Sequence, residues 1–372
     1  MKNTFRKGFA LLMVLILLVP LLGIPALAAL SDDPYSDQQW NLEMIGAEQG
    51  WQSGLTGRGV RVAIIDSGVS TSTGDFDSDR LIAGKNVADE TQSTEDTEGH
   101  GTFIAGIIGA SKDNGVGIAG IAPGVTIIPI KTTDGSTIHV GVNTAAFYAA
   151  IDEYHCDIIN YSTGTTVPSE EYREMVRYAA SKGVIVISSV GNKGDSTVQY
   201  PAAFDEVIGV GSVGRTMECS SFSQHNSSVF VTAPGERITS LSLGTGTVRT
   251  GSGTSYSTPH VVGLAALLKE AHPEMTTEDF KEILKMSCLD LGDEGYDEYY
   301  GWGLIQIPEA IRAADEYFAS HQPDEPDPTP EPTPDPGSSW SIWDLFSFNW
   351  LRELFQNIIR SLFKGWNLNF TL

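Results

Sequence analysis

The chain has 372 residues, 41% of them hydrophobic, which is enough for one large domain with a buried core or for two modest domains. Its formal net charge of −24 argues against nucleic acid as a partner, because phosphate binding requires clustered Lys and Arg. The three cysteines form neither a metal-ligand spacing nor a cysteine active-site motif, so we expect them to be simple core or surface thiols.

Residues 1–28 are predicted to be a signal peptide. Three basic residues precede an unbroken apolar run over 11–19, and Ala-Leu-Ala at 26–28 is typical of a cleavage site. The uncharged stretch 8–30 is also long enough to span a bilayer as a retained anchor, so that alternative stays open. In either case we expect the body of the protein to be exported, and so secreted or extracellular.

Downstream of residue 59, short apolar strands alternate with helices. Strands are predicted at 60–65, 125–130, 157–161, 184–189, 207–210 and 229–233, and helices at 100–109, 145–154, 170–181, 257–271 and 277–286. Short, nearly continuous apolar strands of this kind are typical of a parallel sheet that is covered on both faces. The sequence therefore predicts an α/β domain over 29–320, with a mostly parallel central β-sheet and helices on both faces.

Two segments of different composition follow this domain. Residues 321–339 alternate Pro with Asp, Glu and Thr, which predicts a stiff, solvated linker. Residues 340–372 are predicted to form an amphipathic, aromatic-rich helix, because apolar side chains recur at helical spacing from Leu351 to Trp366. We expect this helix to bind a membrane interface or a partner in the cell envelope, which would make the protein envelope-associated. Packing on the protein's own surface is the alternative, and the long linker argues against it.

Three short motifs carry residues that could act together in nucleophilic catalysis. Asp66 ends a buried strand in Ile-Ile-Asp-Ser-Gly, His100 begins a helix in Gly-His-Gly-Thr, and Ser255 lies just ahead of a helix in Gly-Thr-Ser-Tyr-Ser-Thr-Pro. Each alone is more often a turn or cap residue. In an open α/β sheet, however, strand ends and helix starts gather at the carboxyl edge. The sequence therefore predicts that these three side chains converge in one site.

These motifs, together with others over roughly residues 33–314, resemble the subtilisin family of serine proteases. The resemblance implies that Ser255 attacks the scissile carbonyl, that His100 is the general base, and that Asp66 orients the imidazole. It also implies that Asn192, in Val-Gly-Asn, completes the oxyanion hole. The expected activity is hydrolysis of protein or peptide substrates through an acyl-enzyme, with no cofactor required for the chemistry.

The resemblance also implies where a substrate would lie. Ser162, Thr163 and Gly164 match the strand to which the family binds peptides by strand addition, and Ser189 and Gly191 are expected on the other side of the substrate. Thr163 stands where the family usually has Leu, which makes this wall more polar. We therefore do not expect a preference for large apolar side chains.

Members of the family often bind calcium, and here Asp75 is the candidate carboxylate ligand, with the loop 113–117 as a source of further oxygens. Tyr256 follows the nucleophile where a small residue or Met is more usual, and Phe103 stands where the family often has a His. Fewer residues separate the signal peptide from the first strand than a family prosegment needs, so the protein is expected to fold unaided or with a separate helper.

The alternative to a protease is a non-enzymatic cell-surface protein that reuses the fold and acts through its C-terminal tail. Loss of any of Asp66, His100, Ser255 or Asn192 would have favoured that alternative. All four residues are present in the sequence.

Overall fold

The computed structural model describes residues 31–133 and 140–321. The predicted signal peptide, nearly all of the linker and the C-terminal helix lie outside the described residues. Within the described part of the chain, no helix is long and apolar enough to cross a membrane.

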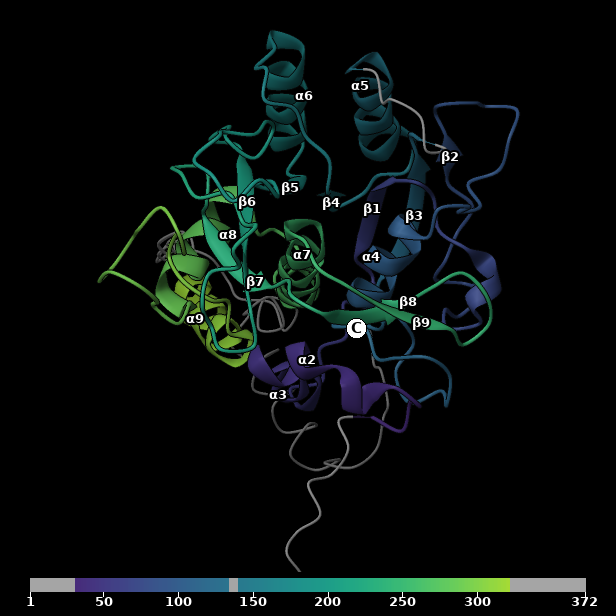
Figure 1. The fold of residues 1–372 in the computed structure, drawn as a ribbon, viewed down its shortest axis with the longest axis horizontal. Helices are drawn as coiled ribbons and strands as arrows, with labels where there is room; N and C mark the ends of the chain where they lie inside the picture. Colours follow the sequence, from purple (N-terminus) through teal and green to yellow (C-terminus); the bar gives the residue numbers. More distant parts are fainter. Residues whose placement is uncertain (1–30, 134–139, 322–372) are drawn as a thin grey trace, which may run out of the picture. The chain divides into compact units, whose positions relative to one another are not determined.

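The centre of the described part is a sheet of seven parallel strands (Figure 1). In chain order the strands are β1 (Arg61–Asp66), β2 (Lys85–Asn86), β3 (Thr126–Lys131), β4 (Ile158–Tyr161), β5 (Ile185–Ser189), β6 (Val207–Val213) and β7 (Val231–Pro234). They lie side by side in the order β2-β3-β1-β4-β5-β6-β7. A separate antiparallel hairpin consists of β8 (Ile238–Leu241) and β9 (Val248–Gly251).

Helices pack on both faces of the sheet. They are α2 (Trp40–Met44), α3 (Ala47–Gln52), α4 (His100–Gly109), α5 (Val140–Tyr148), α6 (Glu170–Ser181), α7 (Thr254–Ala271), α8 (Thr277–Ser287) and α9 (Ile307–Ser320). Figure 1 shows α5 and α6 on one side of the sheet and α4 and α7 on the other. This architecture confirms the predicted α/β class.

Alternation along β1 explains the two layers. Val62 and Ile64 belong to the larger hydrophobic core, which includes α4 and α7, whereas Ala63 and Ile65 belong to the core under α5 and α6. All four side chains are fully buried. Because successive strand residues point to opposite faces, a continuous apolar run is what a doubly covered strand requires.

Several boundaries differ from the prediction. The helix expected at 257–271 begins at Thr254, so Ser255 lies inside the first turn of α7 rather than ahead of it. The helix expected at 145–154 begins at Val140 and passes into a π-helical turn over Ala149–Glu153. Short polar elements such as β2, and the β8–β9 hairpin, were not predicted.

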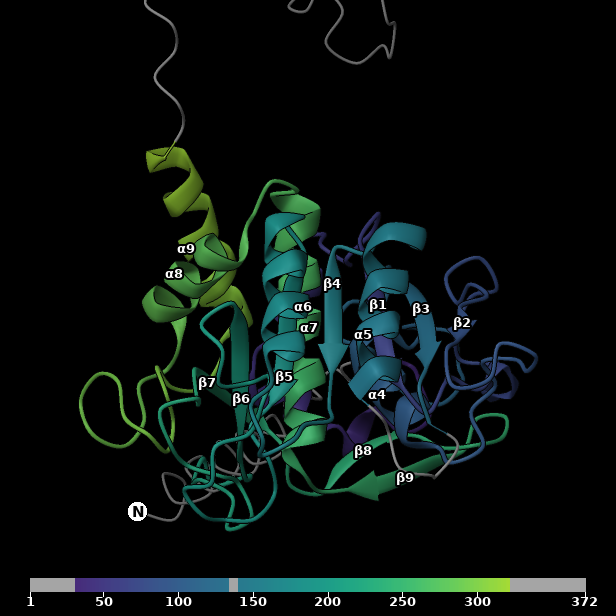
Figure 2. The same ribbon diagram turned by 90° about the horizontal axis from the view of Figure 1, so that it is seen from above.

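The parallel strands point toward the side of the fold on which the β8–β9 hairpin lies, as the arrowheads of β3 and β4 show in Figure 2. Asp66 is the last residue of β1, and the residues from Ser162 follow directly after β4. Val190, Gly191 and Asn192 follow β5 in the same way. The parallel arrangement thus brings three sequence-distant segments to one edge.

Candidate active site

Asp66 and His100 are hydrogen-bonded to each other. His100 Nδ1 lies 2.9 Å from both carboxylate oxygens of Asp66. Asp66 is buried, with 4% of its side chain exposed, and His100 is partly open to solvent at 34%. A carboxylate can only accept here, so Nδ1 carries the proton and Nε2 is left as the basic nitrogen of a neutral imidazole.

Glycines allow this close approach. A Cβ added to Gly101 would lie 2.1 Å from the carbonyl oxygen of Gly68, so the start of α4 fits against the end of β1 only without a side chain. The buried carboxylate of Asp96 then fixes the helix start, because it accepts hydrogen bonds from the backbone N–H of Gly99 and Thr102 at 2.9 Å each. The imidazole of His100 is thus held by Asp66, and the start of the helix that carries it is held by Asp96.

The pKa of His100 reflects opposing influences. Burial lowers the pKa, but attraction to the Asp66 carboxylate and the hydrogen bond with it outweigh burial, so the pKa is raised above the ordinary value of 6.5. The guanidinium of Arg249 acts in the opposite direction and lowers it.

Arg249 belongs to an aromatic layer beside the imidazole. Its guanidinium carbon lies 4.6 Å from the ring centre of Phe103, and its Nη2 donates to the carbonyl of Gly99 at 3.1 Å. The rings of Phe103 and Tyr256 are 4.2 Å apart, and those of Tyr256 and His100 are 5.5 Å apart. The two departures from the family pattern thus contact each other, and Arg249 is a neighbour that the sequence did not reveal.

Ser255 lies in the first turn of α7, next to Tyr256, whose ring lies 5.5 Å from that of His100. Its hydroxyl donates to the carbonyl of Ser162 at 3.3 Å, and the Ser162 hydroxyl donates to the carbonyl of Ser255 at 3.3 Å. In this structure the Ser255 hydroxyl is thus turned toward the segment after β4. Its backbone N–H is one of the first N–H groups of α7, which have no acceptor within the helix.

Asn192 faces the same helix start. Its Oδ1 accepts hydrogen bonds from Thr254 N at 2.8 Å and from Thr254 Oγ1 at 2.9 Å. These bonds use only the oxygen and fix the amide plane, which leaves both protons of Nδ2 to donate elsewhere. Both donors lie near Gly253, since a Cβ added there would be 3.5 Å from Asn192 Nδ2 and 3.8 Å from Ser255 N.

The residues predicted to bind substrate lie in two segments, here called walls, that continue from the neighbouring strands β4 and β5. Ser162 and Thr163 lead from β4 to Gly164 on one side, and Ser189 leads from β5 to Gly191 on the other. Gln199, which sequence reasoning missed, lies between the glycines. A Cβ added to Gly164 would be 2.4 Å from Gln199 Nε2, and one added to Gly191 would be 2.7 Å from Gln199 Oε1.

Asp75 lies away from these walls. It is fully buried, and burial raises its pKa to about 7 although Ile118 N and Asn114 Nδ2 donate to its oxygens at 3.0 and 2.9 Å. A buried carboxylate bonded to neutral donors, next to the oxygen-rich loop 113–117, fits the hard, oxygen-loving Ca²⁺.

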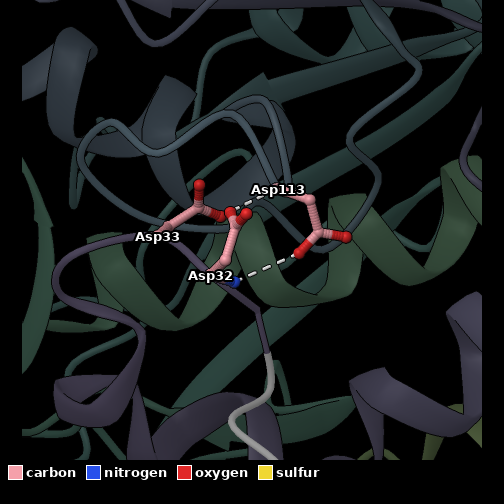
Figure 3. Close-up of side chains that lie close together, drawn as sticks. All are labelled: Asp32, Asp33 and Asp113. Carbon is pink, nitrogen blue, oxygen red and sulfur yellow. Dashed lines mark hydrogen bonds between the residues drawn. The ribbon is translucent and has the colours of Figure 1, made fainter.

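A group of three carboxylates lies where the N-terminal segment meets this loop. Asp32, Asp33 and Asp113 bring one oxygen each within 4.8 Å of one another (Figure 3). Asp33 already accepts hydrogen bonds from the backbone N–H of Asp113, Asn114 and Gly115 at 3.0 to 3.1 Å. These bonds tie the N-terminal segment to the loop and account for the cluster.

Comparison with known proteins gives one consistent result. Residues 57–303 match the profile described as the subtilase family. The minor extracellular protease Epr of Bacillus subtilis is 38% identical over 76% of this chain, and the match spans 43% of Epr, less than half its length. Subtilisin BL of Lederbergia lenta is 33% identical over 73% of this chain and 98% of its own. Subtilisin E of Bacillus subtilis is 35% identical over 73% of this chain and 71% of its own.

Proposed function

The chain belongs to the subtilase family of serine proteases, and on that premise we propose that it is a secreted endopeptidase whose catalytic triad is Asp66, His100 and Ser255. The observation that carries the proposal is the pair of 2.9 Å contacts between His100 Nδ1 and the Asp66 carboxylate. This bond leaves Nε2 deprotonated, so that it can serve as the general base for Ser255.

In this mechanism Ser255 Oγ attacks the scissile carbonyl while His100 Nε2 takes its proton. For that step the hydroxyl must turn from the Ser162 carbonyl, where it donates at 3.3 Å, toward His100. His100 then gives the proton to the leaving amine, and the acyl-enzyme is hydrolysed by a water that the same base activates. Asp66 keeps the productive tautomer and stabilises the imidazolium.

The tetrahedral intermediate carries its negative charge on the former carbonyl oxygen. We assign the oxyanion hole to Asn192 Nδ2 and the backbone N–H of Ser255. Thr254 supports the assignment because its two hydrogen bonds to Asn192 Oδ1 hold the amide in place before charge develops. Donors fixed in advance stabilise a developing charge without a reorganisation cost.

Protein or peptide substrates would bind as an added strand along Ser162, Thr163 and Gly164. These residues continue β4 beyond the last pair of the sheet, so their backbone groups are available on one side. Ser189 and Gly191 would flank the substrate from the other side.

Secretion is supported by the predicted signal peptide and by the extracellular relative Epr. We also propose that the C-terminal helix associates with the cell envelope, as its sequence pattern predicts. No cofactor is needed for the proposed chemistry. Asp75 and the loop 113–117 would hold a structural calcium ion, whose charge would compensate the buried carboxylate.

The test is digestion of a denatured protein such as casein by the wild type and by Ser255→Ala. We expect internal cleavages by the wild type and none by Ser255→Ala. Ser252→Ala is the matched control, because Ser252 is an exposed serine ahead of the same helix, and its hydroxyl oxygen accepts a hydrogen bond from Arg237 N. Equal cleavage by wild type and Ser255→Ala would overturn the proposal.

A further inference from the structure

Gln199 lies between Gly164 and Gly191, the glycines at which the two walls end. If the carbonyl is held between Ser255 and Asn192, the side chain of the residue that carries it, the P1 residue, points between the walls that end at Gly164 and Gly191. The two distances of 2.4 and 2.7 Å from added Cβ positions show that the Gln199 carboxamide touches both walls. We propose that Gln199 fills the P1 site and restricts P1 to small side chains such as Ala, Ser or Gly. This inference rests on the proposed function.

The backbone of Gln199 is fixed against the first wall. Its neighbour Tyr200 pairs with Thr165, through hydrogen bonds of 2.9 and 2.8 Å, immediately beside Gly164. The Gln199 side chain also reaches the second wall, because Nε2 donates to the carbonyl of Ser189 at 3.4 Å. The carboxamide thus bridges the walls.

The space beside Gly191 is also occupied by Gln224. Gln224 is buried, its N–H donates to the Gly191 carbonyl at 3.1 Å, and a Cβ added to Gly191 would lie 1.6 Å from Gln224 Oε1 as well as 2.7 Å from Gln199 Oε1. Closely packed side chains resist displacement. A large P1 side chain would therefore have to expel the Gln199 carboxamide, whereas a methyl or hydroxymethyl group would not.

The polarity of the surroundings agrees with this restriction. Ser188 and Ser189 are consecutive buried residues of β5 whose side chains point to opposite faces of the sheet, so at most one of them faces the space between the walls, and Thr163 stands on the first wall. A Phe or Leu at P1 would meet hydroxyl and carboxamide groups rather than apolar surface, and burying polar groups without partners is costly. Gln199 is half-buried, so a substrate side chain can reach it.

The test measures kcat/KM on peptide p-nitroanilides that differ only at P1, which is Ala, Ser, Leu or Phe. We expect the wild type to favour Ala over Phe by about tenfold or more, and Gln199→Gly to raise the Phe-to-Ala ratio by about tenfold or more, because differences in side-chain fit are worth that much. Gln199→Ala should raise the ratio by less, and Gln199→Glu should still exclude Phe. Gln52→Ala is the control, since Gln52 is exposed on α3, and its ratio should equal that of the wild type.

A wild type that prefers Phe, or a Phe-to-Ala ratio that is the same in wild type, Gln199→Gly and Gln199→Ala, would overturn the inference while leaving the proposed protease intact. A wild type that cleaves none of the peptides, and no protein, would overturn both. If Gln199→Gly does not fold, Gln199→Ala and the wild-type profile decide the outcome.

Discussion

His260 makes the free energy of unfolding depend on pH. It is fully buried in α7, where Nδ1 lies 2.8 Å from the carbonyl of Tyr256 and Nε2 lies 2.9 Å from Asn41 Nδ2. The carbonyl can only accept, so Nδ1 carries the proton and Nε2 accepts from Asn41. If the imidazole were protonated, the new N–H at Nε2 would point at the N–H of Asn41 Nδ2, so two donors would face each other.

Burial lowers the pKa of His260 from 6.5 to about 4. Between these values the unfolded chain binds a proton that the folded chain does not, so the free energy of unfolding falls as pH drops from about 6.5 to about 4. Because the pKa of His260 is lower by about 2.5 in the folded state, the free energy of unfolding falls by about 3 kcal/mol over this pH range. Above pH 6.5 this contribution is constant.

The measurement is urea unfolding at pH 7.5 and at about pH 4. Ser255→Ala serves as the background, so that no proteolysis disturbs the transition. We expect the background to lose about 3 kcal/mol more on acidification than the double variant Ser255→Ala/His260→Gln, in which the other titrating groups are the same. His321→Gln, at an exposed position after α9, is the control and should behave as the background does. Equal losses in the background and the His260→Gln variant would refute the reasoning.

Three further predictions concern other residues. Asn192→Ala should lower kcat by about 10²–10³, as the equivalent loss does in subtilisin, with little change in KM; a loss below about tenfold would contradict the oxyanion assignment. Arg249→Gln should shift the acid limb of the kcat/KM profile to higher pH, because the guanidinium lowers the pKa of His100 and only neutral His100 is a base; Arg215→Gln, which removes another ring-stacked Arg, should not shift it. EDTA should lower the Tm of the wild type in thermal unfolding and leave that of Asp75→Asn unchanged, and identical responses would exclude calcium at Asp75.

The sheet was predictable because burial on both faces leaves a signature in each strand. The run Val62 to Ile65 is entirely apolar and entirely buried, so local sequence and tertiary environment agree. The gathering of the candidate site residues at one edge was predictable for a related reason, because a parallel sheet sends the ends of β1, β4 and β5 to one edge whatever the loops contain.

Elements stabilised by distant contacts were not predictable. β9 is a half-exposed strand, Val248–Gly251, whose sequence carries little apolar pattern, and it exists because it pairs with β8. The neighbours Arg249 and Gln199 reach the site through that hairpin and through the pairing of Thr165 with Tyr200. Neither contact can be read from local spacing, because both depend on how separate segments meet.

The start of α7 was predicted three residues too late, and the reason is local. Gly253, with an extended backbone at φ 160°, allows α7 to begin at Thr254, a residue type common at helix starts. Periodicity of apolar residues becomes visible only from Val261 onward, so it placed the helix start too late.

The most direct test of the proposed mechanism is mapping of a fluorophosphonate adduct by mass spectrometry on the folded protein. We expect one adduct, on Ser255 Oγ, which is absent in Ser255→Ala and forms much more slowly in Asp66→Asn because His100 then loses its orienting carboxylate. An adduct on a different serine, or a folded wild type that takes no label, would contradict the proposed mechanism.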